Sequence, residues 1–346
     1  MRRTSRCALL AALASLLQST PQPGPVAFED VTARGGLDAV LRNSATPEKH
    51  QIETMVGGVA VFDYDGDGLP DIFVTNGARQ PQLTKPDSGW WNRLYRNRGG
   101  GAFEDVTEKA GLWGSGFCMG AAAADYDNDG HPDLFVAAVK RNFLYRNRGD
   151  GTFEDVTEKA GLWGSGFCMG AAAADYDNDG HPDLFVAAVK RNFLYHNRGD
   201  GTFEEVTAKA GIHGEPWSVA AGWFDYDGDG LLDLFVVNYV DWNPKTELVC
   251  KDAESGQAAH CNPKIYTGLP NTLYHNNGDG TFTDVSEPSG IRRQVGKGMA
   301  VAFADYDGDG RPDIFVANDT LPNFLFHNDG NGRFTETAMT AGVGRN

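Results

Sequence analysis

The sequence lacks three features that would point to a familiar functional class: a basic stripe, a membrane-spanning hydrophobic run and a catalytic signature. Lysine and arginine total 30 against 47 aspartate and glutamate residues, and the net charge is −17. Because nucleic acid is bound by clustered cations that neutralise its phosphates, we expect no nucleic-acid partner. The motifs GxSxG and HExxH and the phosphate-binding loop are absent, so the enzyme classes that they mark are not indicated.

The apolar run at the N-terminus, residues 7–17, is short. It has 11 residues and follows three arginines, whereas a transmembrane helix needs about 20 residues. A charged start, a short apolar segment and a polar exit are typical of a secretory signal peptide. We therefore expect a signal peptide at residues 1–20, an extracytoplasmic chain (secreted or periplasmic) at residues 21–346, and no transmembrane segment.

Cysteine is scarce, with five residues in the chain. Cys7 belongs to the predicted signal peptide. Cys250 and Cys261 share an insertion that is not repeated elsewhere, and in an oxidising compartment we expect a disulfide bond between them. Cys118 and Cys168 occupy equivalent positions in two repeats, and we interpret them as small buried residues rather than as a bridge.

The chain is rich in one acidic phrase, DxDxDGxxD, which occurs at residues 63–71, 125–133, 175–183, 225–233 and 305–313. Aspartates at positions 1, 3 and 5 of a tight loop direct several carboxylates inward. The glycine at position 6 permits the turn that brings in a backbone carbonyl at position 7. Hard oxygen donors in a flexible loop suit Ca²⁺ better than Mg²⁺. We therefore predict about one Ca²⁺ per loop, in five loops.

The loops differ from EF-hands in two respects. They have no flanking amphipathic helices, and position 12 is valine where an EF-hand has glutamate. The valines are Val74, Val136, Val186, Val236 and Val316. A calcium switch that opens a hydrophobic groove is therefore not indicated.

Two further phrases recur between the acidic loops. FEDVTEKAGL and its variants begin at residues 28, 103, 153, 203, 282 and 334, and LYRN, LYHN or LFHN begins at residues 94, 144, 194, 273 and 325. Successive loops are 62, 50, 50 and 80 residues apart, a period typical of solenoids and propellers. We expect five units, at approximately residues 38–107, 108–157, 158–207, 208–286 and 287–338.

Two of these repeats are nearly identical. Residues 101–150 and 151–200 differ at two aligned positions only: Ala102 corresponds to Thr152, and Arg146 corresponds to His196. The pair indicates either a recent duplication or an error in assembling the gene.

Each unit predicts four strands: a small-residue strand, an apolar strand after the acidic loop, an LYxN strand and an FxDVT strand. DLFVAAV is short and rich in β-branched and aromatic residues, and LYRNRGDGTFEDV has the turn residues of a hairpin. The segment at 119–125 is rich in alanine, which disfavours strands; we interpret it as the innermost strand of a blade, where crowding favours small side chains. The predicted fold is an all-β propeller of four-stranded blades.

The sequence leaves the closure of the propeller open. The phrase at residues 28–32 has a counterpart at 334–338, so the first and last copies would compete to complete one blade. A closed ring of five blades and an open arc are both compatible with the repeats.

The insertion at residues 239–271 breaks the period, and long loops on a rigid scaffold commonly carry function. It contains Asp241, His260, Lys264 and Tyr266, which would be the candidates if the protein were a propeller-based carbohydrate-active enzyme, a lyase or a hydrolase. A disulfide-pinned cap over a blade is the alternative for this segment.

The tripeptide RGD occurs at residues 148–150 and 198–200 and suggests integrin binding. The same place reads RGG at 98–100 and NGD at 277–279. We therefore interpret it as hairpin-turn chemistry.

The acidic loop followed by DLFV resembles the FG-GAP/VCBS repeats of the integrin α-subunit head. The phrases ETMVGGVAVFDYDGDGLPD at 53–71, FVVNYVDWNP at 235–244, CNPKIYTGLPNTLYHN at 261–276 and ANDTLPNFLFHN at 317–328 resemble secreted repeat proteins of the ASPIC/UnbV type, which are related to cartilage acidic protein. The resemblance covers approximately residues 26–346 and implies a propeller in which each acidic loop joins the first two strands of a blade and holds Ca²⁺.

By this resemblance, the aspartates at positions 1, 3, 5 and 9 and the carbonyl at position 7 of each loop are calcium ligands. They are Asp63, Asp65, Asp67, Leu69 and Asp71; Asp125, Asp127, Asp129, His131 and Asp133; Asp175, Asp177, Asp179, His181 and Asp183; Asp225, Asp227, Asp229, Leu231 and Asp233; and Asp305, Asp307, Asp309, Arg311 and Asp313.

Proteins of this type usually have about seven repeats and a C-terminal ASPIC/UnbV domain. This sequence has five complete units and ends at Asn346, and we expect a truncated gene product. The repetition of the same carboxylates favours structural metal sites over an active site, which is normally single and asymmetric. The sequence therefore predicts a secreted, calcium-binding, non-catalytic module that binds an extracellular protein or glycan; the alternative is the carbohydrate-active enzyme described above.

Overall fold

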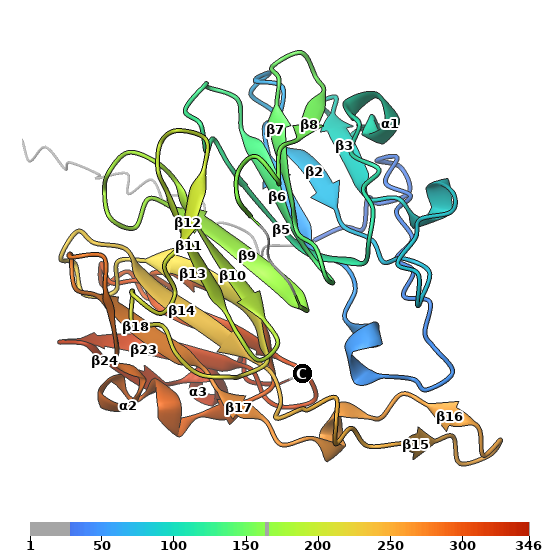
Figure 1. The fold of residues 1–346 in the computed structure, drawn as a ribbon. Helices are drawn as coiled ribbons and strands as arrows, with labels where there is room; N and C mark the ends of the chain where they lie inside the picture. The colour runs from blue at the N-terminus through green and yellow to red at the C-terminus, as the bar shows by residue number, and fades with distance from the viewer. Residues whose placement is uncertain (1–27, 163–165, 346) are drawn as a thin grey trace, which may run out of the picture.

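The computed structural model describes residues 28–162 and 166–345, so the predicted signal peptide lies outside the described residues. The described chain forms five four-stranded antiparallel sheets, and each sheet is built from one continuous stretch of the chain (Figure 1). We call these sheets blades 1 to 5. The predicted all-β fold of four-stranded blades is confirmed.

The blades have the following strands. Blade 1 contains β1 (Val59–Phe62), β2 (Asp71–Val74), β3 (Arg93–Asn97) and β4 (Phe103–Asp105); blade 2 contains β5 (Cys118–Ala124), β6 (Asp133–Ala138), β7 (Phe143–Asn147) and β8 (Phe153–Asp155); blade 3 contains β9 (Cys168–Ala174), β10 (Asp183–Ala188), β11 (Phe193–Asn197) and β12 (Phe203–Glu205); blade 4 contains β13 (Ser218–Phe224), β14 (Asp233–Asn238), β18 (Thr272–Asn276) and β19 (Phe282–Asp284); blade 5 contains β21 (Gly298–Ala304), β22 (Asp313–Asn318), β23 (Phe324–Gly330) and β24 (Arg333–Glu336).

Short elements connect the strands. The helical turns are η1 (Gln51–Thr54), η2 (Ser88–Trp90), α1 (Thr107–Ala110), η3 (Pro263–Ile265), α2 (Ser286–Ser289), η4 (Ile291–Arg293) and α3 (Ala338–Ala341), and the two-stranded ribbons pair β15 (Cys250–Lys251) with β16 (Ala258–Ala259) and β17 (Leu269–Pro270) with β20 (Val295–Gly296). The FxDVT phrase is therefore a strand over only its first three residues in blade 1. A helical turn follows it and ends at Gly111, whose φ of 77° favours glycine.

The small-residue strands are the innermost strands of the blades, as the sequence predicted. β1, β5, β9, β13 and β21 follow one another, each beside the next. A Cβ atom added at Gly120 of β5 would lie 2.5 Å from the carbonyl oxygen of Met169 in β9, which is closer than real Cβ contacts allow. The alanine-rich segment is thus a strand because its backbone must approach the next blade closely, and this requirement overrides the low strand propensity of alanine.

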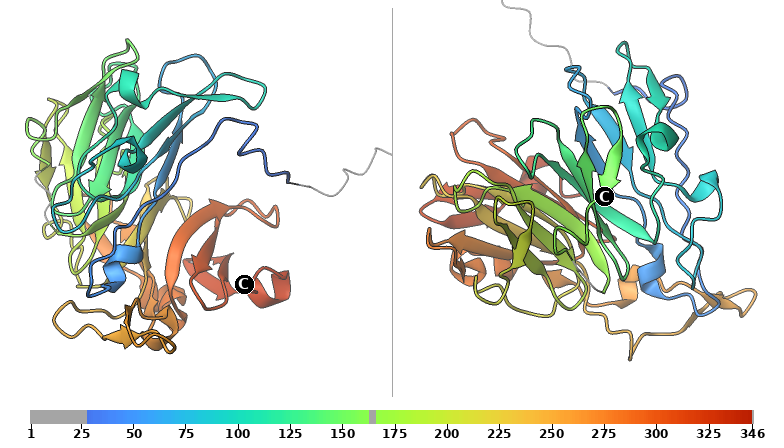
Figure 2. Two further views of the ribbon diagram at one scale, coloured as in Figure 1. Left: turned by 90° about the vertical axis from the view of Figure 1, so that its right-hand side faces the viewer. Right: turned by 45° about the horizontal axis from the view of Figure 1, so that its top comes forward.

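The blades form an open arc (Figure 2). Blades 1 and 5 are its two ends. Val59 and Val61 of β1 are 60% and 62% exposed, and Met299 of β21 is also exposed, whereas the inner strand of blade 3 packs against its neighbours on both sides. Of the two closures that the sequence left open, the structure shows the arc.

The expected competition between the first and last FxDVT phrases does not occur. Residues 334–336 belong to β24 and complete blade 5, whereas residues 28–32 are not in a strand. The first phrase instead leads into a segment that covers blade 1, where the carbonyl of Gly35 accepts a hydrogen bond of 2.8 Å from the amide of Phe103. Blade 1 already has β4 as its fourth strand, so no strand position is left for residues 28–32.

Successive blades are joined by one repeated contact. In each of the first four acidic loops, the tyrosine at position 2 packs on the phenylalanine of the FxDVT strand in the next blade, and its carbonyl accepts a hydrogen bond from the asparagine side chain of the LYxN strand in that blade. The ring pairs are Tyr64–Phe153, Tyr126–Phe203, Tyr176–Phe282 and Tyr226–Phe334, and the asparagines are Asn147, Asn197, Asn276 and Asn328. The first four acidic loops are thereby fixed at the joints between blades.

This joint predicts a difference between two equivalent asparagines. Asn197 donates to the carbonyls of Tyr126, at 2.8 Å, and Pro182, at 3.0 Å. Asn97 makes the corresponding bond within blade 1, to Pro70, and has no preceding blade in the described chain. Because a buried carbonyl left without a donor costs about 1–3 kcal/mol, we expect Asn197→Ala to lower the free energy of unfolding by about that much more than Asn97→Ala. Urea denaturation of both variants measures the difference, and equal losses would contradict the role of the joint.

The insertion in blade 4 is a disulfide-closed hairpin that reaches the segment before blade 1. Cys250 and Cys261 are bonded, as the sequence predicted, and Cys118 and Cys168 are free and buried, also as predicted. Glu247 of the insertion accepts hydrogen bonds from the Trp242 indole at 3.0 Å and from the backbone amide of Gln51 at 2.5 Å. The insertion therefore holds the segment before blade 1 from across the arc.

Candidate metal-binding loops

Each acidic loop joins the first two strands of its blade. In blade 3 the loop begins after Ala174, the last residue of β9, and ends at Asp183, the first residue of β10, and these two residues face each other in the ladder. A hairpin connection of this kind brings its first and last aspartates together without a long-range contact. All five loops have this placement.

The position-1 aspartate folds the loop. In blade 3 the two oxygens of Asp175 accept the amides of Asp179 at 3.0 Å and Gly180 at 2.9 Å. The position-1 aspartate of every other loop accepts the equivalent amides. Gly180 has a φ of 91°, which is the left-handed conformation that the sharp turn needs and that glycine adopts without strain.

The position-5 aspartate orients the residue at position 7. Asp179 accepts the amide of His181 at 2.9 Å, and the same bond occurs in the other loops for Leu69, His131, Leu231 and Arg311. The position-7 residues thus lie in the turn as expected. The role of their carbonyls as metal ligands stays a prediction.

The position-9 aspartate is the buried one. Asp183 is 0% exposed, and its oxygens accept the amides of Tyr176 at 3.2 Å and Asn197 at 2.8 Å. Burial raises the pKa of Asp183 to about 8, and the amide hydrogen bonds oppose this without cancelling it. Burial likewise raises the pKa of Asp133 to about 7 and that of Asp233 to about 6. The cause is the cost of placing a negative charge where water cannot solvate it.

The structure gathers the predicted aspartates of a loop into a small volume. In blades 1 and 2, one oxygen each from positions 1, 3 and 9 lie within 4.8 Å of one another: Asp63, Asp65 and Asp71, and Asp125, Asp127 and Asp133. One oxygen of Asp65 and one of Asp127 are buried and make no hydrogen bond to any part of the chain that the structure describes. Like charges this close repel one another, so the oxygen set and the unpartnered oxygens fit a hard divalent cation such as Ca²⁺.

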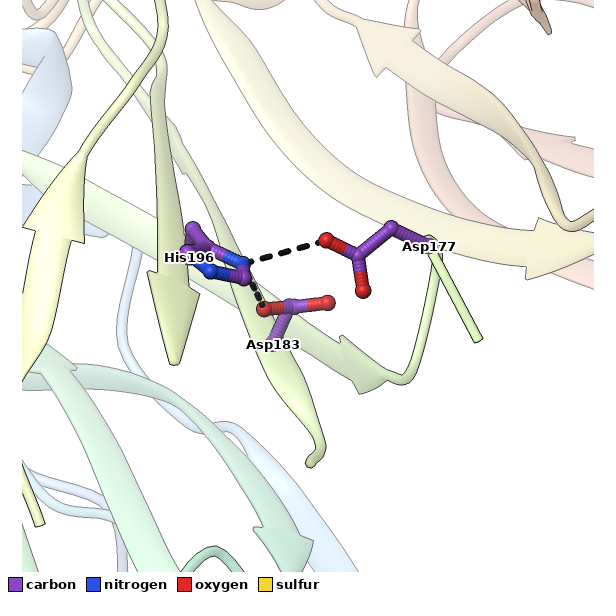
Figure 3. Close-up of side chains that lie close together, drawn as sticks. All are labelled: Asp177, Asp183 and His196. Carbon is purple, nitrogen blue, oxygen red and sulfur yellow. Dashed lines mark ion pairs between the residues drawn. The ribbon is translucent and has the colours of Figure 1, made fainter. Parts of the chain in front are cut away.

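Sequence reasoning missed one residue that lies at each loop, the third residue of LYxN. In blade 2 the guanidinium of Arg146 contacts Asp127, with Nε 2.6 Å from Oδ2, and Asp129, with Nη2 2.8 Å from Oδ2. In blade 3 the equivalent residue is His196, whose Nδ1 lies 3.2 Å from Oδ2 of Asp177 and 3.2 Å from Oδ1 of Asp183 (Figure 3).

The signal that could have found this residue is the strand register. Tyr195 of β11 faces Leu184 of β10, so the residue after the tyrosine lies next to the first residue of β10, which is the position-9 aspartate. Predicting the contact required the pairing of the second and third strands as well as their sequences.

The four candidates in the insertion do not form one site. Asp241 and Tyr266 line a pocket of about 220 Å³ together with Trp242 and Glu247. Lys264 is exposed, and His260 points to Glu53, with 3.4 Å between Nε2 and Oε2. The lining of the pocket contains neither His260 nor Lys264.

The RGD segments are hairpin turns. In the first, the amide of Arg148 donates to Thr152 and the carboxylate of Asp150 accepts from the same residue, while Gly149 has a φ of 72°. This geometry agrees with the turn chemistry inferred from the sequence.

Among the helices within residues 28–162 and 166–345, none is long and apolar enough to cross a membrane. The fold and the loops define a class: a repeat protein of propeller blades, each with an aspartate-rich loop between its first two strands. The FG-GAP-like repeat matches residues 63–136, 127–186, 177–236, 265–316 and 305–346. These matches cover most of the chain, and the protein belongs to the FG-GAP-like repeat family.

Relatives among characterised proteins agree with the resemblance seen in the sequence. The chain is 39% identical over 72 residues to cartilage acidic protein 1 of Xenopus tropicalis and 42% identical over 57 residues to that of Homo sapiens. These stretches are 20% and 16% of this chain and only 11% and 9% of the relatives, so the match spans about a tenth of their length.

One similar solved structure is a lectin from Agrocybe aegerita that recognises non-reducing terminal N-acetylglucosamine. Its TM-score is 0.44 at 19% identity, over 81% of this chain and 65% of the lectin chain.

Proposed function

We propose that this protein is a calcium-binding propeller that acts outside the cytoplasm as a non-catalytic binding module for a protein or a glycan. The observation that carries the proposal is the gathering of carboxylate oxygens within 4.8 Å in the acidic loops. The aspartates at positions 1, 3, 5 and 9 and the position-7 carbonyl would hold the ion, and bound calcium would supply positive charge that offsets their repulsion.

Calcium fits these loops for reasons of chemistry and of compartment. The loops offer several oxygen donors from one short turn, and calcium accepts such irregular oxygen sets, whereas magnesium requires near-octahedral geometry. The disulfide between Cys250 and Cys261 is typical of an oxidising compartment outside the cytoplasm, where calcium concentrations are high enough to fill sites with a Kd of about 10⁻⁴–10⁻³ M.

Repetition supports binding rather than catalysis. The same loop geometry occurs in all five blades, and catalysis normally needs one site with different residues in different roles. The insertion offers an asymmetric surface, because its pocket is lined by Asp241, Trp242, Glu247 and Tyr266. An aromatic and acidic pocket on a long loop suits recognition of a polar partner.

Metal content tests the proposal. We expect the purified protein, dialysed against millimolar calcium, to retain up to five Ca²⁺ per chain by native mass spectrometry. Replacing Asp225 and Asp227 together by asparagine should remove one ion, because the loop of blade 4 then keeps only two of its four carboxylates, those of Asp229 and Asp233. A protein that retains no calcium under these conditions would contradict the proposed metal role.

A second arm separates binding from catalysis. The same preparation is applied to immobilised glycans and extracellular matrix proteins, and the captured ligand is assayed for cleavage. Binding without new reducing ends or peptide termini supports the binding module, whereas cleavage that Tyr266→Phe abolishes would support the carbohydrate-active enzyme instead.

A further inference from the structure

The third residue of LYxN divides the five loops into two chemical classes. Blades 1 and 2 have Arg96 and Arg146 at this place, and blades 3, 4 and 5 have His196, His275 and His327. In every blade the structure places this side chain at the carboxylates of its own loop. We call the first two the arginine loops and the other three the histidine loops.

In the arginine loops a protein cation already lies among the carboxylates. Arg96 has Nε 2.6 Å from Oδ2 of Asp65 and Nη2 3.0 Å from Oδ2 of Asp67, which matches the contacts of Arg146 in blade 2. A guanidinium keeps its charge at any ordinary pH. A metal ion that uses these same oxygens must therefore displace the arginine or lie close to a like charge.

In the histidine loops the side chain offers a nitrogen donor instead. Nδ1 of His275 lies 3.5 Å from Oδ2 of Asp227 and 3.3 Å from Oδ1 of Asp233, and Nδ1 of His327 lies 3.3 Å from the equivalent oxygens of Asp307 and Asp313. The Nδ1 atoms of all three histidines are buried and make no hydrogen bond within the described residues. An imidazole nitrogen aimed between two carboxylates is a donor set for a first-row divalent ion.

Blade 5 has one additional cation, and it leaves the nitrogen and its two oxygens unchanged. Arg311 at position 7 pairs with Oδ2 of Asp309, whereas His327 faces Asp307 and Asp313. The arrangement around Nδ1 is thus the same in all three histidine loops.

The chain contains a natural comparison between the two classes. Residues 101–150 and 151–200 are identical except at Ala102/Thr152 and Arg146/His196. Their loops have the same sequence, DYDNDGHPD, and their strands have the same register. One of the only two differences between the copies is therefore the residue that contacts the loop.

We infer that this residue decides which metal each loop takes. The histidine loops are mixed nitrogen and oxygen sites that bind a first-row divalent cation such as Co²⁺, Zn²⁺ or Mn²⁺ as well as calcium. The arginine loops lack this nitrogen donor and hold a protein cation among the same oxygens, so they bind divalent ions more weakly than the histidine loops do. This inference rests on the proposed metal-binding function and assigns its specificity.

Exchanging the two residues tests the inference. Metal-free protein is titrated with Co²⁺ and the bound ions are counted by native mass spectrometry, using wild type, Arg146→His and His196→Arg. We expect three Co²⁺ sites in the wild type, four in Arg146→His and two in His196→Arg. The loss of a ligand weakens the affected loop at least about tenfold. Ala102→Thr removes the other difference between the two repeats and should leave the number of bound Co²⁺ ions at three.

Two further measurements distinguish failure of this inference from failure of the proposed function. In protein labelled with ¹⁵N-histidine, Zn²⁺ should shift the Nδ1 resonance of His196, and an unmoved resonance overturns the assignment of the imidazole as a ligand. If calcium binds to all five loops and the exchange leaves every count unchanged, the inference is wrong and the proposed function stands. If neither calcium nor Co²⁺ binds, the proposed function itself fails. Circular dichroism establishes that each variant is folded.

Discussion

We expect removal of calcium to lower the melting temperature of the protein by roughly 5–15 °C. The proposed reason is mass action: if the acidic loops bind the ion only when folded, calcium favours the folded state. At 10 mM calcium, a site with a Kd of 10⁻³–10⁻⁴ M contributes about 1.4–2.7 kcal/mol. The loops join the first two strands of every blade, and four of them lie at joints between blades, so the contributions of several loops would add to the stability of the same structure.

Thermal unfolding in calcium and in chelator measures this effect. Magnesium at the same concentration is the control, because it requires a more regular coordination shell and should restore little of the lost stability. Equal melting temperatures in calcium and in chelator would show that the loops are stable without metal. Such a result would remove the main support for the proposed function.

The features that the sequence predicted are local and repeated. The acidic loop is a hairpin connection whose internal hydrogen bonds run between residues at most seven apart, such as Gly180 to Asp175 and Tyr176 to Asp183. Five copies of such a phrase give five independent indications of one structure. The alanine-rich inner strand was also predictable, because small side chains at the same place in every repeat indicate crowding. Gly120 confirms this by its approach to Met169.

The features that the sequence did not predict depend on contacts between segments. The arginine or histidine at the loop is found only when the register of the second and third strands is known. Similarly, the hydrogen bond from the Gln51 amide to Glu247 joins residues 196 positions apart, and no local sequence pattern indicates it. The openness of the arc depends on how each blade is rotated against the next, which is determined by packing at the joints.

The tyrosine at position 2 of the acidic loop shows the same limit of prediction from local sequence. Its pattern places it in a turn, and nothing local indicates burial. Tyr176 is nevertheless 3% exposed because Phe282 and Trp223 of blade 4 pack on its ring. The sequence of each repeat determines the strands of its blade. The packing of neighbouring blades then determines which residues of the loop are buried.

Replacing Asp183 by alanine should destabilise the protein by about 2–6 kcal/mol even when no calcium is present. The carboxylate accepts the amides of Tyr176 and Asn197, and both of these residues also form joints between blades. The carbonyl of Tyr176 accepts from Asn276 of blade 4, and the side chain of Asn197 donates to Tyr126 of blade 2. Alanine leaves two buried amides without acceptors, each at a cost of about 1–3 kcal/mol.

Asp175→Ala is the matched control, because Asp175 is a predicted metal ligand of the same loop but bonds only to amides of the loop itself. Urea denaturation in chelator should therefore show a large loss for Asp183→Ala and a smaller one for Asp175→Ala. In calcium the loss for Asp175→Ala should grow, since that variant then also lacks a ligand. If the two variants lose the same stability in chelator, the position-9 aspartate is not the residue that holds the joints together, and the loops contribute to stability through the metal alone.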